Sequence, residues 1–211
     1  MSQTGRGRLI ALEGIDGCGK STQAQRLADR LGARLTFEPG ATDLGASLRQ
    51  LLLDPGEAPV AGRTEALLMA ADRAQHVAEV VRPALDAGTW VVTDRYAAST
   101  LAYQGYGRGL DLAVLERLIE WATGGVTPDV TVLIDVPVSV AASRRKGSPD
   151  DRLERQGNGF LQRVADGYRR LSAEATTPWI VVDGTGSVEA VAAAVWTGVS
   201  TTIGSAPQHA R

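Results

Sequence analysis

Eight consecutive residues near the N-terminus have the types and spacing of a loop that binds phosphate. Residues 14–21 read GIDGCGKS and fit the pattern G-x-x-x-x-G-K-[ST]. Glycines at these positions let backbone N–H groups turn toward one point, where the start of a following helix adds partial positive charge. Lys20 would reach the β- and γ-phosphates of a nucleoside triphosphate, and the Ser21 hydroxyl would ligand Mg²⁺.

The candidate nucleotide-binding residues are this loop and the residue that follows it. They are Gly14, Ile15, Asp16, Gly17, Cys18, Gly19, Lys20, Ser21 and Thr22. A chance match to the pattern occurs in roughly one chain per hundred of this length. An apolar strand before the pattern and a helix after it make a chance match rarer still. Converging N–H groups would favour a thiolate at Cys18, but we prefer the interpretation that the loop merely tolerates a small residue there.

A second carboxylate for phosphoryl transfer is expected at Asp94, which ends an apolar run at residues 90–94. It would hold Mg²⁺ or its waters, and Arg95 beside it would meet a second phosphate. Glu13, Asp135 and Asp183 also end apolar runs and would face the same crevice. The alternative is that these acids only cap the helices that follow, and we favour it for Asp135 and Asp183.

Apolar strands alternate with amphipathic helices along the chain, which predicts an α/β fold with one five-stranded parallel sheet covered on both faces. The carboxyl ends of the strands would then share one ligand crevice. The expected strands are residues 8–13, 34–37, 90–94, 130–135 and 179–183. The expected helices are residues 22–31, 44–53, 65–81, 99–104, 112–119 and 160–173, with others after Pro137 and Ser187.

Particular residues should begin or end these helices. Gly32 would stop the first one, while Asp111 and Ser187 would cap later ones. Thr64 would cap the helix that begins at residue 65, and Pro83 would break or kink its end. His76, on the same helix, is expected at the surface.

Composition limits the classes of function. The 211 residues are 44% hydrophobic and carry a net charge of −2, which argues against a general nucleic-acid binder. A single cysteine cannot form an internal disulfide, so a cytoplasmic location fits. No signal peptide or membrane span is expected. One domain should cover residues 1–203, and residues 204–211 should be a disordered tail.

Five segments resemble the bacterial thymidylate kinases, a family of P-loop nucleoside monophosphate kinases. They read LEGIDGCGKST (12–22), EPG (38–40), ADRAQ (71–75), DRYAASTLAYQG (94–105) and DRLE (151–154). The match runs from about residue 8 to 199, and the segment at 94–105 is the most specific part. The resemblance implies a P-loop kinase fold with a short lid. It also implies a homodimer that transfers the γ-phosphoryl group of ATP to dTMP, with Mg²⁺, and supplies dTDP for dTTP synthesis.

The resemblance also assigns residues to the thymine base. Arg73 would donate to thymine O4, and Met69, one turn earlier, would lie against the ring with a thioether contact where family members often have an aromatic. Ser99, Thr100 and Gln104 would read the base edge.

The sugar and phosphate of dTMP would be held by another set of residues. The ring of Tyr103 would crowd the 2′ position, and Asp16 would accept from the 3′-hydroxyl. Arg95 and Arg49 would bind the 5′-phosphate. Phe37 stands where the family has an arginine, so one expected phosphate contact is missing and the other two arginines gain importance.

The charged stretch at residues 143–156 resembles the lid of these kinases. The phosphate loop has no arginine, so a cation for the transferring group must come from elsewhere. Arg144, Arg145 and Arg152 are the candidates, and which one reaches the phosphates stays open. The alternative is an ordinary solvated loop.

Two other functions remain open at this stage. One is a kinase of a different nucleoside monophosphate, against which Arg73 and the Ser99–Thr100 pair argue. The other is a catalytically silent relative that binds ATP and signals. Lys20, Ser21 and Asp94 together argue against it.

Overall fold

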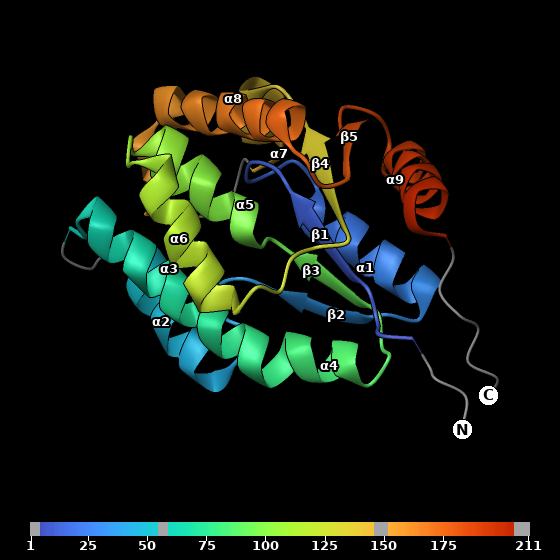
Figure 1. The fold of residues 1–211 in the computed structure, drawn as a ribbon. Coiled ribbons are helices and arrows are strands. Elements are labelled where there is room, and N and C mark those ends of the chain that lie inside the picture. The colour runs from blue at the N-terminus through green and yellow to red at the C-terminus, as the bar shows by residue number, and fades with distance from the viewer. Residues whose placement is uncertain (1–4, 55–58, 146–151, 205–211) are drawn as a thin grey trace.

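Five parallel strands form one sheet at the centre of the computed structural model, which describes residues 5–54, 59–145 and 152–204 (Figure 1). The strands are β1 (Leu9–Glu13), β2 (Arg34–Phe37), β3 (Val91–Asp94), β4 (Val130–Asp135) and β5 (Trp179–Asp183). Their order across the sheet is β2-β3-β1-β4-β5. Every neighbouring pair is parallel. The predicted α/β class and the number of strands are confirmed.

Helices connect the strands and lie on both sides of the sheet (Figure 1). The α-helices are α1 (Lys20–Leu31), α2 (Asp43–Leu53), α3 (Gly62–His76), α4 (Arg82–Asp86), α5 (Ala97–Thr100), α6 (Leu112–Thr123), α7 (Val138–Arg144), α8 (Asn158–Glu174) and α9 (Val188–Ile203). Two π-helical segments are η1 (Val77–Val81) and η2 (Leu101–Gly107), and η3 (Glu154–Gln156) is a short 3₁₀ turn.

The core follows from the alternation of side chains along the central strand β1. Leu9 and Ala11 pack with Val81 and Leu85 of the η1–α4 segment. Ile10 and Leu12 point to the other face, into a larger cluster that includes residues of α1, α8 and α9. Since all five residues of β1 are buried, the chain after it is held rigidly where the phosphate loop begins.

Three predicted helix boundaries are confirmed by their hydrogen bonds. Gly32 ends α1 in a left-handed conformation, with its N–H bonded to the carbonyls of Ala28 and Asp29. The Asp111 side chain accepts from the N–H of Val114. Ser187 accepts in the same way at the start of α9.

Two expectations for the helix near residues 65–81 are wrong, namely the cap at Thr64 and a break at Pro83. The helix begins earlier, at Gly62, with Ala61 rather than Thr64 at its N-cap position. Pro83 does not break it either, because the helix passes into the π-helical turn η1 and then into α4. In that wider turn the N–H of Arg82 bonds to the carbonyl of Val77, and the turn accommodates the proline that follows.

The helix expected at residues 99–104 is longer than predicted. It begins at Ala97 and continues through η2 to Gly107. Its glycines mark close packing: a Cβ on Gly107 would lie 2.7 Å from the ring of Phe160 in α8. The segment that carries the candidate base-binding residues is therefore packed against α8, and it also contacts α6 and α3.

None of the helices in the described part of the chain is both long and apolar enough to cross a membrane. The centre of the predicted lid, at residues 146–151, lies outside the described residues. So does nearly all of the tail that was expected to be disordered.

Candidate active site

The predicted phosphate loop follows β1 and wraps around the side chain of Lys20. Gly14 and Gly17 have φ angles of 142° and 86°, in the region that favours glycine. A Cβ on Gly17 would lie 2.5 Å from the carbonyl oxygen of Ala141, so only glycine fits. The Lys20 ammonium donates to the carbonyl of Ile15 at 3.1 Å and lies 3.7 Å from an Asp16 oxygen. The loop and the β5–α9 connection, including Gly184 and Val188, line a cavity of about 500 Å³.

Ser21 and Asp94 meet where β3 ends. The Ser21 hydroxyl donates to Asp94 Oδ2 at 2.5 Å. Asp94 Oδ1 is buried without a hydrogen-bond partner among the described residues. The Ser21 hydroxyl and the Asp94 carboxylate, whose Oδ1 is unsatisfied, are hard oxygen donors that fit Mg²⁺.

Arg95 reaches from the end of β3 back to the phosphate loop. One terminal nitrogen lies 2.6 Å from Asp16 Oδ1, and the other donates to the carbonyl of Gly14 and to Ser99 Oγ. The Tyr103 hydroxyl donates to the second Asp16 oxygen at 2.8 Å. Burial alone would raise the pKa of Asp16, but Arg95 and then Lys20 outweigh it and hold that pKa well below its usual range.

Glu13 does not face the crevice, although it ends β1. It is fully buried, and its carboxylate accepts from the N–H of Tyr96 and from the hydroxyls of Ser99 and Tyr168. Burial raises its pKa against these hydrogen bonds. The Ser99 hydroxyl, expected at the base edge, is thereby engaged with Glu13 and Arg95.

Tyr168 was missed by sequence reasoning. It continues the buried stripe of α8 that includes Phe160, Leu161 and Val164, so its spacing indicates only a core position. Its hydroxyl nevertheless accepts from Arg95 at 3.1 Å. The residue therefore ties α8 to the candidate site.

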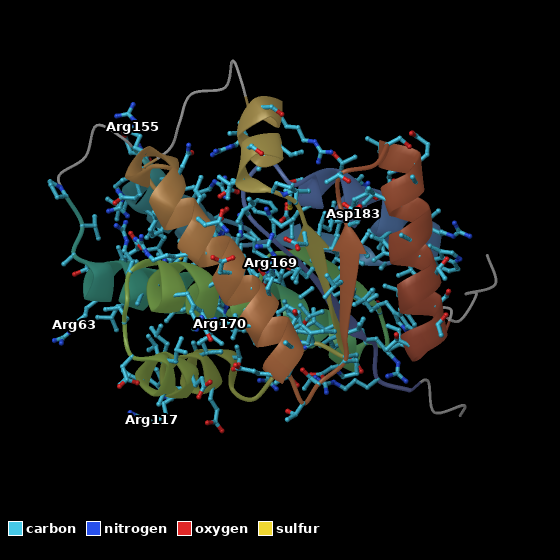
Figure 2. The ribbon with its side chains drawn as sticks, turned by 90° about the horizontal axis from the view of Figure 1, so that it is seen from above. Arg63, Arg117, Arg155, Arg169, Arg170 and Asp183 are labelled. Atoms are coloured by element: carbon cyan, nitrogen blue, oxygen red, sulfur yellow. The ribbon has the colours of Figure 1, made fainter. Side chains whose placement is uncertain are left out.

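The two other strand-end acids are engaged by residues outside the phosphate loop. Asp135 forms a two-pronged ion pair with Arg169 of α8, at 2.9 and 3.0 Å. Asp183, at the end of β5, accepts from the N–H of Thr185 and has a lowered pKa for that reason. Figure 2 labels Arg169 and Asp183 on α8 and at the tip of β5. Each acid has a structural partner, and neither caps the next helix as expected.

Arg73 is buried and held by three different parts of the chain. Its Nε donates to Glu38 at 2.8 Å, and its two terminal nitrogens donate to Thr100 Oγ1 and to the carbonyl of Tyr96, each at 2.9 Å. It lines a cavity of about 80 Å³ together with Met69, Thr100, Tyr103, Gln104 and Leu153. The residues predicted for the base are thus neighbours.

Within this pocket, Gln104 has its own partner. Its side-chain amide donates to the buried carboxylate of Glu65 at 2.9 Å, and Arg108 pairs with the same carboxylate. The carbonyl oxygen of the Gln104 amide and its second N–H are left to read a base edge.

His76 is not at the surface. Its exposed fraction is 0%, and both ring nitrogens lie within hydrogen-bond distance of polar side chains. Sequence reasoning failed here because a single histidine on a helix face carries no sign of what packs over it.

Asp72 lies next to this histidine and is also buried. Its Oδ1 accepts from the N–H of Gly40 at 2.9 Å. Burial and the neighbouring charge of Glu38 raise the pKa of Asp72 from 3.8 to about 6. Between these values the folded protein keeps a proton that the unfolded chain has lost. The stability that this group contributes is therefore complete below pH 3.8 and is lost as the pH rises through about 6.

We expect Asp72→Asn to remove this pH dependence, because an amide does not titrate yet can still accept from Gly40. At about pH 7.5 the variant should be more stable than wild type by up to about 3 kcal/mol, and the difference should shrink toward about pH 4. Urea unfolding at both pH values measures it. Parallel stability curves for the two proteins would contradict the assignment.

Arg49 lies beside the aromatic ring of Phe37, where the resemblance predicted an arginine. Its guanidinium carbon is 6.0 Å from the centre of the Phe37 ring, and it donates to the carbonyl of Pro39 at 2.7 Å. Arg49, Phe37, Lys20, Asp94 and Arg95 line a cavity of about 300 Å³. The position of Arg49 on its wall is compatible with the predicted phosphate contact.

The three lid arginines lie in different places. Arg144 donates to the carbonyls of Cys18 and Gly184 and lines the cavity of the phosphate loop. The Arg145 side chain crosses over Gly17, where a Cβ would lie 3.0 Å from its Cγ. Arg152 donates to the carbonyl of Leu52, near the end of α2.

Arg152 also pairs with Glu65 at 3.4 Å. Its neighbour Leu153 lines the pocket of Arg73. Arg155, farther along, is exposed and lies at the edge of the molecule in Figure 2. Of the lid arginines, Arg144 and Arg145 at the end of α7 are therefore near the phosphate loop, and Arg152 is near the base pocket.

Cys18 is buried inside the loop, and burial raises the pKa of its thiol. A raised pKa disfavours the thiolate, in agreement with the interpretation that the loop tolerates a small residue there. Thr22 is exposed and lines the same cavity as Arg144.

The three cavities adjoin one another, because several residues line more than one of them. The 80 and 300 Å³ cavities share Glu38 and Arg49, and all three cavities are lined by Asp16. Lys20 and Ser21 line both larger cavities. The chain thus has a pocket with buried hydrogen-bonding groups at one end, a phosphate cradle at the other, and cations between them.

Comparison with known proteins gives consistent findings. The family model for thymidylate kinase matches residues 12–195. The chain is 48% identical over 200 residues to a thymidylate kinase of Prochlorococcus marinus strain MIT 9313, covering 90% of this chain and 92% of the relative. It is 54% identical over 179 residues to one from Synechococcus sp. strain RCC307, covering 79% and 84%. A crystal structure of thymidylate kinase from Ehrlichia chaffeensis superimposes with a TM-score of 0.77 at 29% identity, covering 92% of this chain and 99% of that one.

Proposed function

The chain belongs to the thymidylate kinase family, and we propose that it transfers the γ-phosphoryl group of ATP to the 5′-phosphate of dTMP. One observation carries the proposal: the cavity of about 300 Å³, which Lys20 lines, and the pocket of Arg73 share the pair Asp16 and Arg95. A donor phosphate and an acceptor phosphate would therefore meet between cations. Positioning and charge stabilisation are what phosphoryl transfer requires.

ATP and Mg²⁺ fit the residues around the loop. The cavity of about 500 Å³ lies between the phosphate loop and the β5–α9 connection, with room for a nucleotide and with N–H groups for its phosphates. Ser21 and Asp94 supply the oxygen donors for Mg²⁺. When bound, the ion would neutralise charge on the β- and γ-phosphates. Lys20 binds the same phosphates from within the loop.

The hydrogen-bond donors of Arg73 favour a base with a carbonyl at position 4. A guanidinium has five N–H groups and no acceptor. Three of them are engaged with Glu38, Thr100 and Tyr96, so each terminal nitrogen retains one hydrogen. Thymine O4 would accept a hydrogen bond from these nitrogens. The amino group of cytosine is itself a donor, so it would leave the Arg73 donors without an acceptor.

Arg144 and Arg145 are the lid cations that we propose for the transferring phosphate, because they lie against the phosphate loop. Arg152 would reach the phosphates only by leaving Glu65 and the end of α2. We propose instead that it holds Leu153 against the base pocket.

Tyr103 is proposed to exclude a 2′-hydroxyl. Its ring is fixed edge-on against Phe160 and Tyr168, with centroids 6.2 and 6.3 Å away, so it cannot easily move aside. We expect Tyr103→Ala to weaken dTMP but to narrow the gap in kcat/KM between dTMP and its ribose counterpart by roughly tenfold.

Tyr103→Phe is the matched control for this prediction. It keeps the ring and removes only the hydroxyl that donates to Asp16. It should lower activity on both nucleotides and keep their ratio. If Tyr103→Ala also keeps the ratio, the ring supports the pocket without gating it.

We further propose that the chain forms a homodimer through α2, α3 and α6. These helices pack together and expose large apolar side chains: Leu44, Leu51, Leu67, Val114 and Trp121, with Trp121 83% exposed. A patch of this kind favours a protein interface. We also propose a single domain over residues 1–203 and a cytoplasmic location, where the one cysteine would stay reduced.

A coupled assay of ADP formation, with and without dTMP, tests the function. dTMP should strongly stimulate ADP release, and a panel of other nucleoside monophosphates should not. A different preferred acceptor would indicate another monophosphate kinase. ATP binding without turnover on any acceptor would indicate a silent relative.

A further inference from the structure

A buried chain of polar side chains leads from the middle of β2 to the base pocket. It consists of Thr36, His76, Glu38 and Arg73, which are at most 5% exposed. Thr36 Oγ1 lies 2.7 Å from His76 Nε2, and His76 Nδ1 lies 2.8 Å from Glu38 Oε1. Glu38 Oε2 accepts from Arg73 Nε at 2.8 Å. We call this set the β2 relay.

The chemistry of these groups fixes the direction of the hydrogen bonds. An ionised carboxylate only accepts, so His76 Nδ1 carries a hydrogen and donates to Glu38. In the neutral ring, Nε2 is then an acceptor, and the Thr36 hydroxyl donates to it. Glu38 therefore fixes the tautomer, and Thr36 holds the orientation of the imidazole ring from its other nitrogen.

Glu38 is held at both of its oxygens as a result. Without His76, the carboxylate could rotate about its last bond, and one buried oxygen would lose its donor. The plane of the Arg73 guanidinium is set by three bonds, to Glu38, Thr100 and the Tyr96 carbonyl. The bond to Glu38 is the charged one of the three, so its direction contributes most to where the remaining hydrogens point.

We infer that Thr36 and His76 are positioning residues that aim Arg73 at position 4 of the pyrimidine. Neither lines the pocket of Arg73, although Thr36 lines the cavity of about 300 Å³, and both act on the base through Glu38. This inference rests on the proposed function, because it takes the pocket of Arg73 as the base site. It assigns a role in base recognition to His76, which contacts the Glu38 oxygen that Arg73 does not, and to Thr36, which contacts His76.

The test compares dTMP with 4-thio-dTMP, in which a weakly accepting sulfur replaces O4. The preference is the ratio of the values for dTMP and 4-thio-dTMP, measured both as Kd without ATP and as kcat/KM. Wild type should prefer dTMP by both measures. His76→Leu removes the donor to Glu38, so the preference should fall by roughly tenfold, toward one. The KM for ATP should not change.

Two further variants sharpen the comparison. His76→Asn keeps an amide N–H near the place of Nδ1 and should retain most of the preference. Thr36→Val is isosteric and removes only the hydroxyl; it should lower the preference in the same direction but less, and it decides the question if His76→Leu does not fold.

Val77→Ala is the matched control. Val77 is buried on the same helical stretch, outside the β2 relay. Its truncation should lower the melting temperature and leave the preference for dTMP unchanged. If His76→Leu and Thr36→Val behave like Val77→Ala, the relay has only a structural role and the inference is overturned. If wild type does not bind dTMP at all, the result contradicts the proposed function itself, and the inference that rests on it is overturned as well.

Discussion

Replacing Lys20 with alanine is expected to lower kcat by a factor on the order of 10²–10³ while the protein remains folded. The Lys20 ammonium is held inside the loop by the carbonyl of Ile15 and the charge of Asp16. It is thus positioned before the substrates bind, and it neutralises charge that develops during transfer. Steady-state kinetics at saturating ATP and dTMP measure the effect.

Lys20→Met separates charge from packing in this experiment. It keeps a stem of similar length in a position that is only 5% exposed, but it carries no ammonium. Both variants should be equally inactive, and Lys20→Met should unfold at a temperature closer to that of wild type. Turnover near the wild-type value in either folded variant would overturn the assignment of the phosphate loop.

The sheet could be predicted from sequence almost residue by residue because its signals are local. β2, β4 and β5 have the predicted bounds, and β1 and β3 differ by one residue. Their apolar runs are bounded by glycine, proline or charged residues, and the phosphate loop has a spacing that few other structures share. Local signals also gave the caps at Asp111 and Ser187.

The continuous helix through Pro83 could not be predicted, because the outcome depends on tertiary packing. A proline normally ends a helix. Here Val77, Val81 and Leu85 on either side of it pack against β1, and one π-helical turn keeps them on that face. The gain from burial outweighs the disturbed hydrogen bonds.

The partners of polar side chains were the least predictable part of the site. Glu13 was expected in the crevice and His76 at the surface, yet both are fully buried. Tyr168 looked like a core aromatic, yet it contacts Arg95. In each case the deciding neighbour comes from a distant part of the chain, and residue type alone does not indicate whether a buried polar group has partners.

Arg95 combines strain and function at one position. Its φ angle is 73°, in the left-handed region that costs a non-glycine residue about 1–2 kcal/mol. The backbone is held there by bonds from the Arg95 N–H to Leu12 and from Thr93 Oγ1 to the Arg95 carbonyl. This conformation turns the side chain from the end of β3 toward Asp16 and the phosphate loop.

Two substitutions separate these contributions. Both Arg95→Ala and Arg95→Gly remove the guanidinium, so kcat/KM for dTMP should fall by a factor on the order of 10²–10³ in each. They differ in the backbone, because glycine adopts this φ without strain but loses more entropy on folding. Arg95→Gly should therefore be the more stable of the two, by about 0.5–1 kcal/mol.

The difference in stability between Arg95→Ala and Arg95→Gly reports the backbone alone, because both variants lose the same charge. Either variant removes the main cation beside Asp16, whose burial then raises its pKa with only Lys20 left to oppose it. That cost is the same for alanine and glycine, and urea unfolding of the pair isolates the backbone term. Equal stabilities would show that the left-handed conformation is not strained here. An active Arg95→Gly would show that the phosphate of dTMP is bound without this guanidinium. Arg49, which lines both the 80 Å³ and the 300 Å³ cavity, would then be the cation that binds it.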